Sequence, residues 1–138
     1  MNDLNRLHKD HKKLLHIASR LAHFITLDAP PPASFLYSLR QELSSTLIRH
    51  LTAEDWLLYP GLLRSSDAHV AHVAQSFADE MGGLATLFRD HSERWVAYAI
   101  ETDWAGYRRE TALLLEALTT RITREDRDLF PLCANLAA

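Results

Sequence analysis

The sequence predicts an all-α protein, an up-down-up-down antiparallel four-helix bundle formed by a single domain over residues 1–138. Apolar residues recur at alternating three- and four-residue steps through four long segments, which is the period of an amphipathic helix. No segment of the sequence shows the two-residue alternation of a half-buried strand. Prolines and capping residues separate the four segments by short connections, so consecutive helices are expected to run antiparallel.

The first helix is predicted over residues 3–26. Its stripe is Leu4, Leu7, His11, Leu14, Ala18, Leu21 and Ile25. Pro30, Pro31 and Pro32 follow it and stop the helical pattern, because proline lacks an amide hydrogen and its ring clashes with the preceding turn. Ser34 is a favourable N-cap residue, so the second helix is predicted to begin beside it.

The second helix is predicted from about residue 35 to residue 59. Its stripe is Leu36, Leu39, Leu43, Leu47, His50, Glu54 and Leu57. Pro60 and Gly61 are expected to end this helix. The polar run at residues 65–67 then offers a cap for the third helix.

The third helix is predicted over residues 67–100 and the fourth from residue 104 to about residue 130. Their stripes are Ala74, Phe77, Met81, Leu84, Phe88, His91 and Trp95, and then Tyr107, Leu114, Leu118, Arg121, Glu125 and Leu129. Gly82 and Gly83 lie inside the third helix, where each glycine costs roughly 1 kcal/mol relative to alanine. Close helix packing or a local kink is favoured over space for a small ligand. Loops are expected near residues 27–34, 60–66 and 101–104.

Composition excludes several classes of protein. The net charge of -3 and the pI near 6.2 argue against binding to nucleic acid or to an anionic membrane. The single cysteine excludes a disulfide within the chain, and no segment resembles a signal peptide or a membrane span, so a cytoplasmic protein is expected. The tryptophans Trp56, Trp95 and Trp104 are compatible with packing between helices or with a homodimer face; a protein partner is unknown.

A motif occurs twice in the chain, about seventy residues apart. Residues 49–60 read RHLTAEDWLLYP and residues 120–131 read TRITREDRDLFP. The two copies share Thr-x-Glu-Asp, a leucine, an aromatic residue and a final proline, but His50 in the first copy is Arg121 in the second. The offset matches helix one with three and helix two with four, which indicates a duplicated helical hairpin.

Five polar residues occupy positions on the apolar stripes: His11, His50, Glu54, Arg121 and Glu125. Burying an unpaired polar group costs on the order of 1–3 kcal/mol, so these side chains are expected to meet and satisfy one another. In antiparallel neighbours their heights agree at one end of the bundle core. Histidines and carboxylates on facing helices are also how bundle proteins build metal sites.

These residues carry a resemblance to a known family. The matching segments are Asp10-His11-x-x-Leu14, His50-Leu-x-x-Glu54-Asp55 with Tyr59-Pro60, and Glu125-Asp126 with Phe130-Pro131. In this order and spacing the chain resembles the hemerythrin-like proteins, the HHE cation-binding family, over nearly its whole length. The resemblance implies a four-helix bundle that holds two irons, each bound by two histidines, with two carboxylates bridging them.

Carried over to this chain, the resemblance implies that one iron site survives and the other is lost. The first keeps its histidines, His11 and His50, and the bridging carboxylates survive as Glu54 and either Glu125 or Asp126. The second site has lost its histidines to Phe77, Met81 and Arg121. His11, His50, Glu54 and Glu125 are therefore the candidate metal ligands, and Arg121 is predicted to replace the charge of the missing ion.

Three functions are compatible with this pattern. The first is a sensory, regulatory or cation-binding module with a degenerate site, which is neither an enzyme nor a diiron oxygen carrier. The second is an enzyme that depends on one iron or zinc ion. The third is a metal-free interaction domain, in which Arg121 forms a buried salt-bridge cluster with Glu54 and Glu125. The expected cofactor is accordingly one iron, zinc or manganese ion, or none.

Overall fold

The computed structural model describes residues 2–137, and the side chains of residues 4–133. The helices are α1 (Asn2–Phe24), α2 (Ala33–Ala53), α3 (Tyr59–Leu63), α4 (Ala68–Met81), α5 (Leu84–Arg94), α6 (Ala97–Thr102), α7 (Trp104–Arg124) and α8 (Phe130–Ala137), with π-helical segments η1 (Glu54–Leu58) and η2 (Glu125–Leu129). No strand occurs in the described part of the chain, so the all-α prediction is confirmed.

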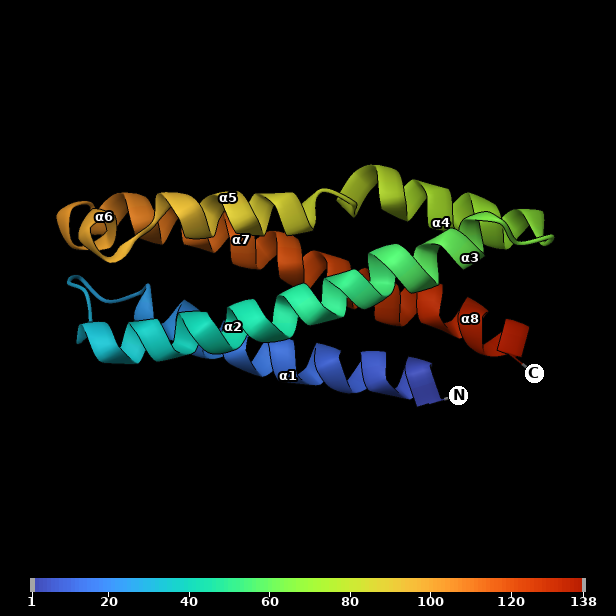
Figure 1. Ribbon diagram of the computed structural model, residues 1–138, viewed down its shortest axis with the longest axis horizontal. Helices are drawn as coiled ribbons and strands as arrows, with labels where there is room; N and C mark the ends of the chain where they lie inside the picture. Colours follow the sequence, from blue (N-terminus) through green and yellow to red (C-terminus); the bar gives the residue numbers. More distant parts are fainter. Residues whose placement is uncertain (1, 138) are drawn as a thin grey trace.

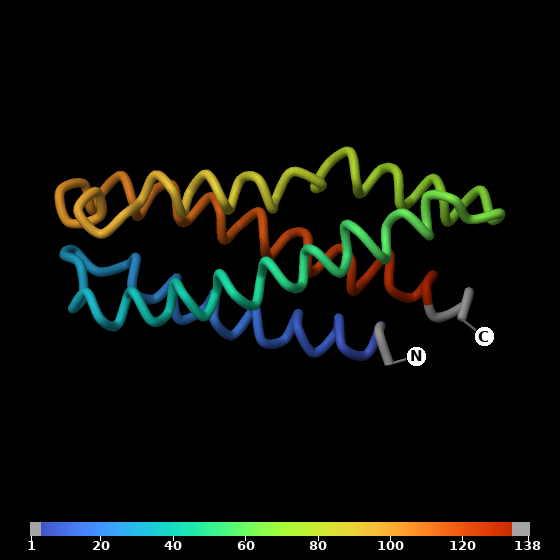
Figure 2. Tube along the Cα trace, in the orientation of Figure 1, coloured from blue at the N-terminus to red at the C-terminus, as the bar shows by residue number. Residues whose placement is uncertain are grey.

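The elements form four rods that lie side by side (Figure 1). The first rod is α1, the second is α2 with η1 and α3, the third is α4 with α5, and the fourth is α7 with η2 and α8. The start of α1 and the junction of η2 with α8 lie toward the same end as the turn between α3 and α4, while the α1–α2 loop and α6 lie at the other end (Figures 1 and 2). This is the antiparallel bundle that the four stripes predicted.

The second rod does not end at Pro60, contrary to the sequence expectation. Its helix continues as α3 to Leu63, and it passes through the wide turn η1, in which the Tyr59 amide donates to the Glu54 carbonyl five residues back. A proline inside an α-helix clashes with the carbonyl four residues earlier, and a wide turn moves that carbonyl away. The fourth rod has the same arrangement, since η2 precedes Pro131 and α8 runs to Ala137.

The third rod is interrupted, so the single helix expected over residues 67–100 is wrong. The helix breaks between α4 and α5 at Gly82 and Gly83, and again between α5 and α6 at Trp95 and Val96. A Cβ atom on Gly82 would lie 2.4 Å from the carbonyl oxygen of Ala78, so the backbone there approaches too closely for any side chain. The two glycines mark a local break in the helix, as favoured from the sequence.

The predicted caps agree with the structure at one helix and differ at another. The carboxylate of Asp67 accepts hydrogen bonds from the amides of His69 and Val70 and caps α4. At α2 the helix begins at Ala33, directly after the prolines, and Ser34 therefore lies inside the first turn without capping it. In the described part of the chain, no helix is sufficiently long and apolar to cross a membrane.

The core consists of two apolar clusters with a polar layer between them. The larger includes Leu14, Leu47 and Ile122, and the smaller, nearer the termini, includes Leu7 and Leu129. The polar layer is His11, His50, Glu54, Arg121 and Glu125, each at most 2% exposed. The sequence analysis expected these residues at one end of the core. The structure instead places the layer between the two apolar clusters, which enclose it from both directions.

Candidate metal centre

Four side chains of the polar layer converge on one point inside the bundle. His11 comes from α1, His50 from α2, Glu54 from the start of η1 and Glu125 from the start of η2. One nitrogen or oxygen atom from each lies within 4.8 Å of the corresponding atoms of the other three. The structure therefore brings together the four residues that the sequence marked as candidate ligands.

The inner edges of the two imidazole rings, which carry the Nε2 atoms, point at the two carboxylates. His11 Nε2 lies 3.2 Å from Glu125 Oε1 and 3.6 Å from Glu54 Oε2, and His50 Nε2 lies 3.0 Å from Glu54 Oε1. The two imidazole rings are 4.7 Å apart between centroids. Every atom in this contact set is withdrawn from solvent, so its charge must be balanced locally.

Two further carboxylates, Asp126 and Asp10, hold the outer edges of the same rings, a role that the sequence analysis did not assign to them. His11 Nδ1 lies 2.7 Å from Asp126 Oδ1, and His50 Nδ1 lies 3.1 Å from Asp10 Oδ2. A carboxylate accepts, so each Nδ1 carries a hydrogen and each ring directs its Nε2 atom to the centre. A carboxylate behind a histidine is the usual support of a metal-binding imidazole.

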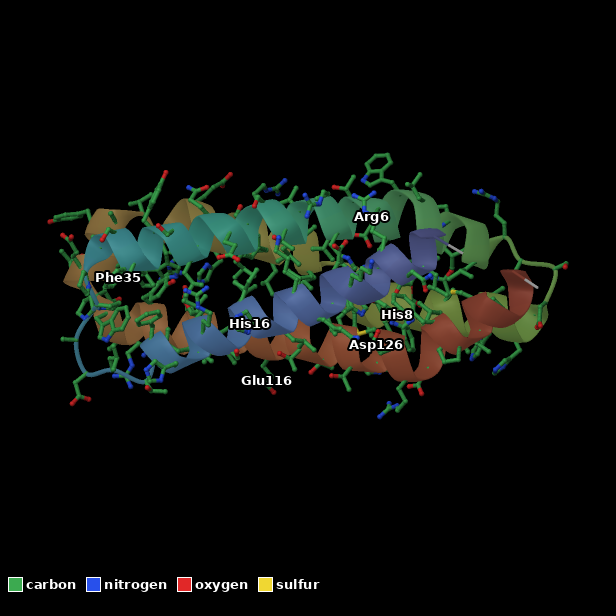
Figure 3. All side chains as sticks on the ribbon, turned by 90° about the horizontal axis from the view of Figure 1, so that it is seen from below. Arg6, His8, His16, Phe35, Glu116 and Asp126 are labelled. Carbon is green, nitrogen blue, oxygen red and sulfur yellow. The ribbon has the colours of Figure 1, made fainter. Side chains whose placement is uncertain are left out.

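This arrangement decides between Glu125 and Asp126, which the sequence left open. Glu125 is fully buried and faces the centre, whereas the Asp126 side chain is 38% exposed and stands behind His11. Figure 3 shows Asp126 and His8 labelled where α1 runs beside the last rod. His8 Nδ1 lies 3.4 Å from Asp126 Oδ1 and its side chain is 42% exposed, so His8 stays outside the central cluster.

Four buried atoms at the centre have no hydrogen-bond partner among the residues that the structure describes: His11 Nε2, His50 Nε2, Glu54 Oε2 and Glu125 Oε1. Buried polar atoms in folded proteins are nearly always paired, and an exception requires an explanation such as a bound ion. Two imidazole nitrogens and two carboxylate oxygens form a donor set that suits iron, zinc or manganese. The residues present therefore fit a single divalent cation.

Without a cation, protons must neutralise the same atoms. Burial lowers the pKa of His11, but hydrogen bonds from its charged form to Glu125 and Glu54 outweigh burial and raise that pKa to about 10. Burial raises the pKa of Glu54, but hydrogen bonds to His11 and His50 outweigh it and lower that pKa below its ordinary value. Burial and the neighbouring Glu54 raise the pKa of Glu125 to about 7. A metal ion would replace this protonation.

Arg121 closes the other side of the carboxylate pair. Its Nε donates to Glu125 Oε2 at 3.1 Å, and its Nη2 donates to Glu54 Oε1 at 3.3 Å and to Asp55 Oδ1 at 2.7 Å. Burial lowers the pKa of Arg121, but these three carboxylates raise it above its ordinary value, so the guanidinium is permanently charged. The position that a histidine occupies in the first copy of the motif thus carries a fixed cation in the second.

The break in the third rod supplies another partner of Arg121. Because α4 ends at Met81, the Met81 carbonyl is released from helical hydrogen bonding and accepts from Arg121 Nη1 at 3.3 Å. Phe77, one turn earlier on α4, is buried in the smaller apolar cluster. Both positions that replace the expected histidines on this rod therefore offer the centre no metal ligand.

Tyr59 is a member of the site that sequence reasoning missed. Its hydroxyl donates to Glu125 Oε2 at 2.7 Å, and the Arg121 guanidinium lies 5.5 Å from the centroid of its ring. Burial and the charge of Glu125 raise the pKa of Tyr59, so the phenol keeps its proton and remains a donor. The aromatic residue shared by the two motif copies was the available signal.

Bundle proteins that hold metal ions do so with histidines and carboxylates buried between their helices, and this chain has that arrangement. The chain matches the Hemerythrin HHE cation binding domain over residues 2–133, which includes every residue of the centre, and it belongs to that family. No curated protein and no solved structure shows a significant match to it.

Proposed function

We propose that the protein is a cation-binding module that holds one metal ion through His11, His50, Glu54 and Glu125. The observation that carries this proposal is that four buried nitrogen and oxygen atoms from three rods converge, with no hydrogen-bond partner among the described residues. In addition, a carboxylate holds the outer nitrogen of each imidazole. When bound, the ion supplies a concentrated positive charge and, if it is iron, a redox-active centre. The four side chains hold it, and Tyr59 and Arg121 orient the carboxylates.

Arg121 makes a second ion at the neighbouring position unfavourable. Its guanidinium occupies the far side of Glu54 and Glu125, and Phe77 and Met81 present no nitrogen ligand there. We therefore propose a mononuclear site rather than a diiron oxygen carrier, with a sensory or regulatory role for the bound ion. Arginine provides one positive charge without open coordination positions, so it replaces the charge of a metal but not its chemistry.

The test is a metal titration of the purified chain under anaerobic conditions with Fe²⁺, Zn²⁺ and Mn²⁺. One ion bound per chain is expected, measured by elemental analysis after desalting and by calorimetry. His50→Ala should abolish binding, while His16→Ala, an exposed histidine on α1, should leave it unchanged. The absence of binding for all three ions would refute the proposal and favour a metal-free cluster, in which protons neutralise the buried side chains.

The mononuclear assignment has its own test. Arg121→His restores the histidine of the second motif copy, yet the stoichiometry should stay at one ion per chain because α4 still supplies no ligand. Two ions in this variant would contradict the conclusion that α4 supplies no ligand, and two ions in the unaltered protein would contradict the role given to Arg121.

A cavity of about 340 Å³ beside Arg121 is the observation that favours an enzyme as the second candidate. It is lined by Asp55, Tyr59, Phe77 and Arg121 among others, and by none of the four proposed ligands. A molecule in this cavity would contact the guanidinium and the tyrosine rather than the ion. We therefore place the enzyme hypothesis second. A catalytic activity of the unaltered protein that is lost in His50→Ala would support it.

A further inference from the structure

A second polar site lies in the other half of the bundle, between α2, α5 and α7. A cavity of about 180 Å³ is lined there by Arg40, Ser44, His91 and Tyr107 on its polar side. Tyr107 and Arg121 are fourteen residues apart on α7, about 21 Å at the rise of an α-helix. The cavity is thus separate from the candidate metal centre, and the proposed cation-binding role does not account for it.

The Tyr107 hydroxyl is the first observation that points to a ligand. Tyr107 is fully buried, and its hydroxyl oxygen has no hydrogen-bond partner among the described residues. Thr111 acts on the Tyr107 hydroxyl only from longer range, and the Thr111 hydroxyl lies 2.9 Å from His91 Nε2. Burial raises the pKa of Tyr107, so the phenol is a neutral group with a hydrogen to donate. A buried hydroxyl without a partner is costly, and a polar ligand atom would satisfy it.

Arg40 is the second observation. It is half-buried at the cavity wall, and its guanidinium lies 6.0 Å from the centroid of the Tyr107 ring. Its Nη2 donates to the Trp95 carbonyl at 2.6 Å, and none of the ion pairs found among the described side chains includes Arg40. The Glu110 carboxylate on α7 is engaged by the Trp95 indole and by Arg94. A positive charge therefore faces the cavity without an anion to balance it.

The other walls are apolar and limit what the ligand can be. Leu21, Leu43, Phe88 and Leu114 form the apolar part of the lining, and Tyr37, Gln41 and Ser92 complete it. Burial, with Arg40 nearby, lowers the pKa of His91 to about 4, so His91 adds no second positive charge at neutral pH. A single charge at one side and hydrocarbon at the other match a small monoanion with a short apolar tail, and the volume admits only a few heavy atoms.

We propose that this cavity binds a short-chain carboxylate, whose oxygens contact the Arg40 guanidinium and the Tyr107 hydroxyl and whose aliphatic end lies against Leu43 and Phe88. Charge-assisted hydrogen bonds to a guanidinium hold the carboxylate, and the apolar walls select for the tail. Because the residues belong to three rods, the bound ligand joins α2, α5 and α7 to one another.

The experiment is a titration of the full chain with butyrate, acetate, butyramide and inorganic phosphate, followed by calorimetry and by NMR shifts of the cavity residues. Butyrate is expected to bind at least about 10-fold more tightly than neutral butyramide, since a hydrogen bond to a charged group contributes about 1.5–3 kcal/mol. Acetate and phosphate should bind more weakly than butyrate, because neither fills the apolar side.

Substitutions of the residues that line the cavity test whether butyrate binds there. Arg40→Gln should weaken butyrate binding by about 10- to 100-fold, and Tyr107→Phe by a smaller factor, with the helix content unchanged. The matched control is Arg108→Gln, because Arg108 also donates to a main-chain carbonyl, that of Ile25, but does not line the cavity. The proposal is overturned if the unaltered chain binds no carboxylate at millimolar concentrations, if butyramide binds as tightly as butyrate, or if Arg40→Gln and Arg108→Gln behave alike.

Discussion

Arg121 is the fixed positive charge of the buried polar layer. Its three carboxylate partners are Glu54, Asp55 and Glu125, two of which also face the histidines. A buried cation shared among anions is stable only while every charge keeps its partner. The residue therefore links the folding of the core to the charge state of the site.

Replacing Arg121 with alanine should destabilise the metal-free protein by about 3–5 kcal/mol, because the variant leaves Glu54 and Glu125 adjacent and uncompensated in the core. Urea unfolding in the presence of a chelator measures the change. Arg124→Ala is the matched control, one turn further along the same rod: its partner Glu80 is exposed, so a cost of at most about 1 kcal/mol is expected. Equal effects of the two substitutions would show that the buried cluster is not what depends on Arg121.

His91 should make the fold sensitive to mild acid. Its pKa is about 4 in the folded chain, against about 6.5 when exposed, chiefly because burial opposes the charged form. The unfolded chain therefore binds more protons between these values, so this contribution to stability is complete above pH 6.5 and is lost as the pH falls toward 4. The free energy of unfolding of His91→Gln should fall less steeply with acid over this interval.

The control for this measurement is His69→Gln, because His69 is exposed and should leave the acid dependence as it is in the unaltered protein. An identical slope in His91→Gln and the unaltered protein would mean that other groups account for the whole acid sensitivity.

At the scale of elements, two wide turns position the carboxylates of the site. Glu54 is the first residue of η1 and Glu125 is the first residue of η2. Each segment is followed by an aromatic residue and then by a proline. Such π-helical turns are uncommon and concentrate at functional sites. The repeated Thr-x-Glu-Asp motif with its final proline thus describes one structural device used twice.

The break in the third rod is a testable element as well. Gly82→Ala should destabilise the protein by roughly 1–3 kcal/mol, because the added Cβ would meet the Ala78 carbonyl oxygen at 2.4 Å and must displace the backbone. Gly83→Ala, next to it, has no atom within 4 Å of the added Cβ and should be neutral or slightly stabilising. Thermal and urea unfolding of the two variants measure the difference in stability. A Gly82→Ala variant as stable as Gly83→Ala would contradict the steric explanation.

At the scale of the whole molecule, the proposed cation would join three rods. Its proposed ligands come from α1, from the second rod and from the fourth, and apolar clusters lie on both sides of it. A ligand that binds only the folded chain stabilises it by about 2.7 kcal/mol at one hundred times its dissociation constant. Unfolding should therefore shift to higher temperature with added Zn²⁺ or Mn²⁺ and return with a chelator.

The decisive comparison uses Glu54→Gln, which keeps the shape of the site but removes a charge that the ion requires. This variant should show a much smaller shift in melting temperature with metal than the unaltered chain. A full shift in Glu54→Gln would place the ion elsewhere on the molecule.

The sequence by itself determined the all-α fold and the polar residues that meet in the core. Helical periodicity is a local property, so the four stripes and the five polar interruptions, from His11 to Glu125, can be read without coordinates. Because a polar side chain on an apolar stripe must find a partner, their convergence also followed from the sequence alone.

The tertiary structure decided which neighbours complete the site. Glu125 and Asp126 are adjacent carboxylates, and the wide turn η2 together with the position of α1 determines that one faces the centre and the other stands behind His11. Tyr59 and the Met81 carbonyl also join through contacts between rods distant in sequence. Such contacts depend on where helices deviate from regular geometry, at a π turn or a glycine break, and periodicity carries no information about these deviations.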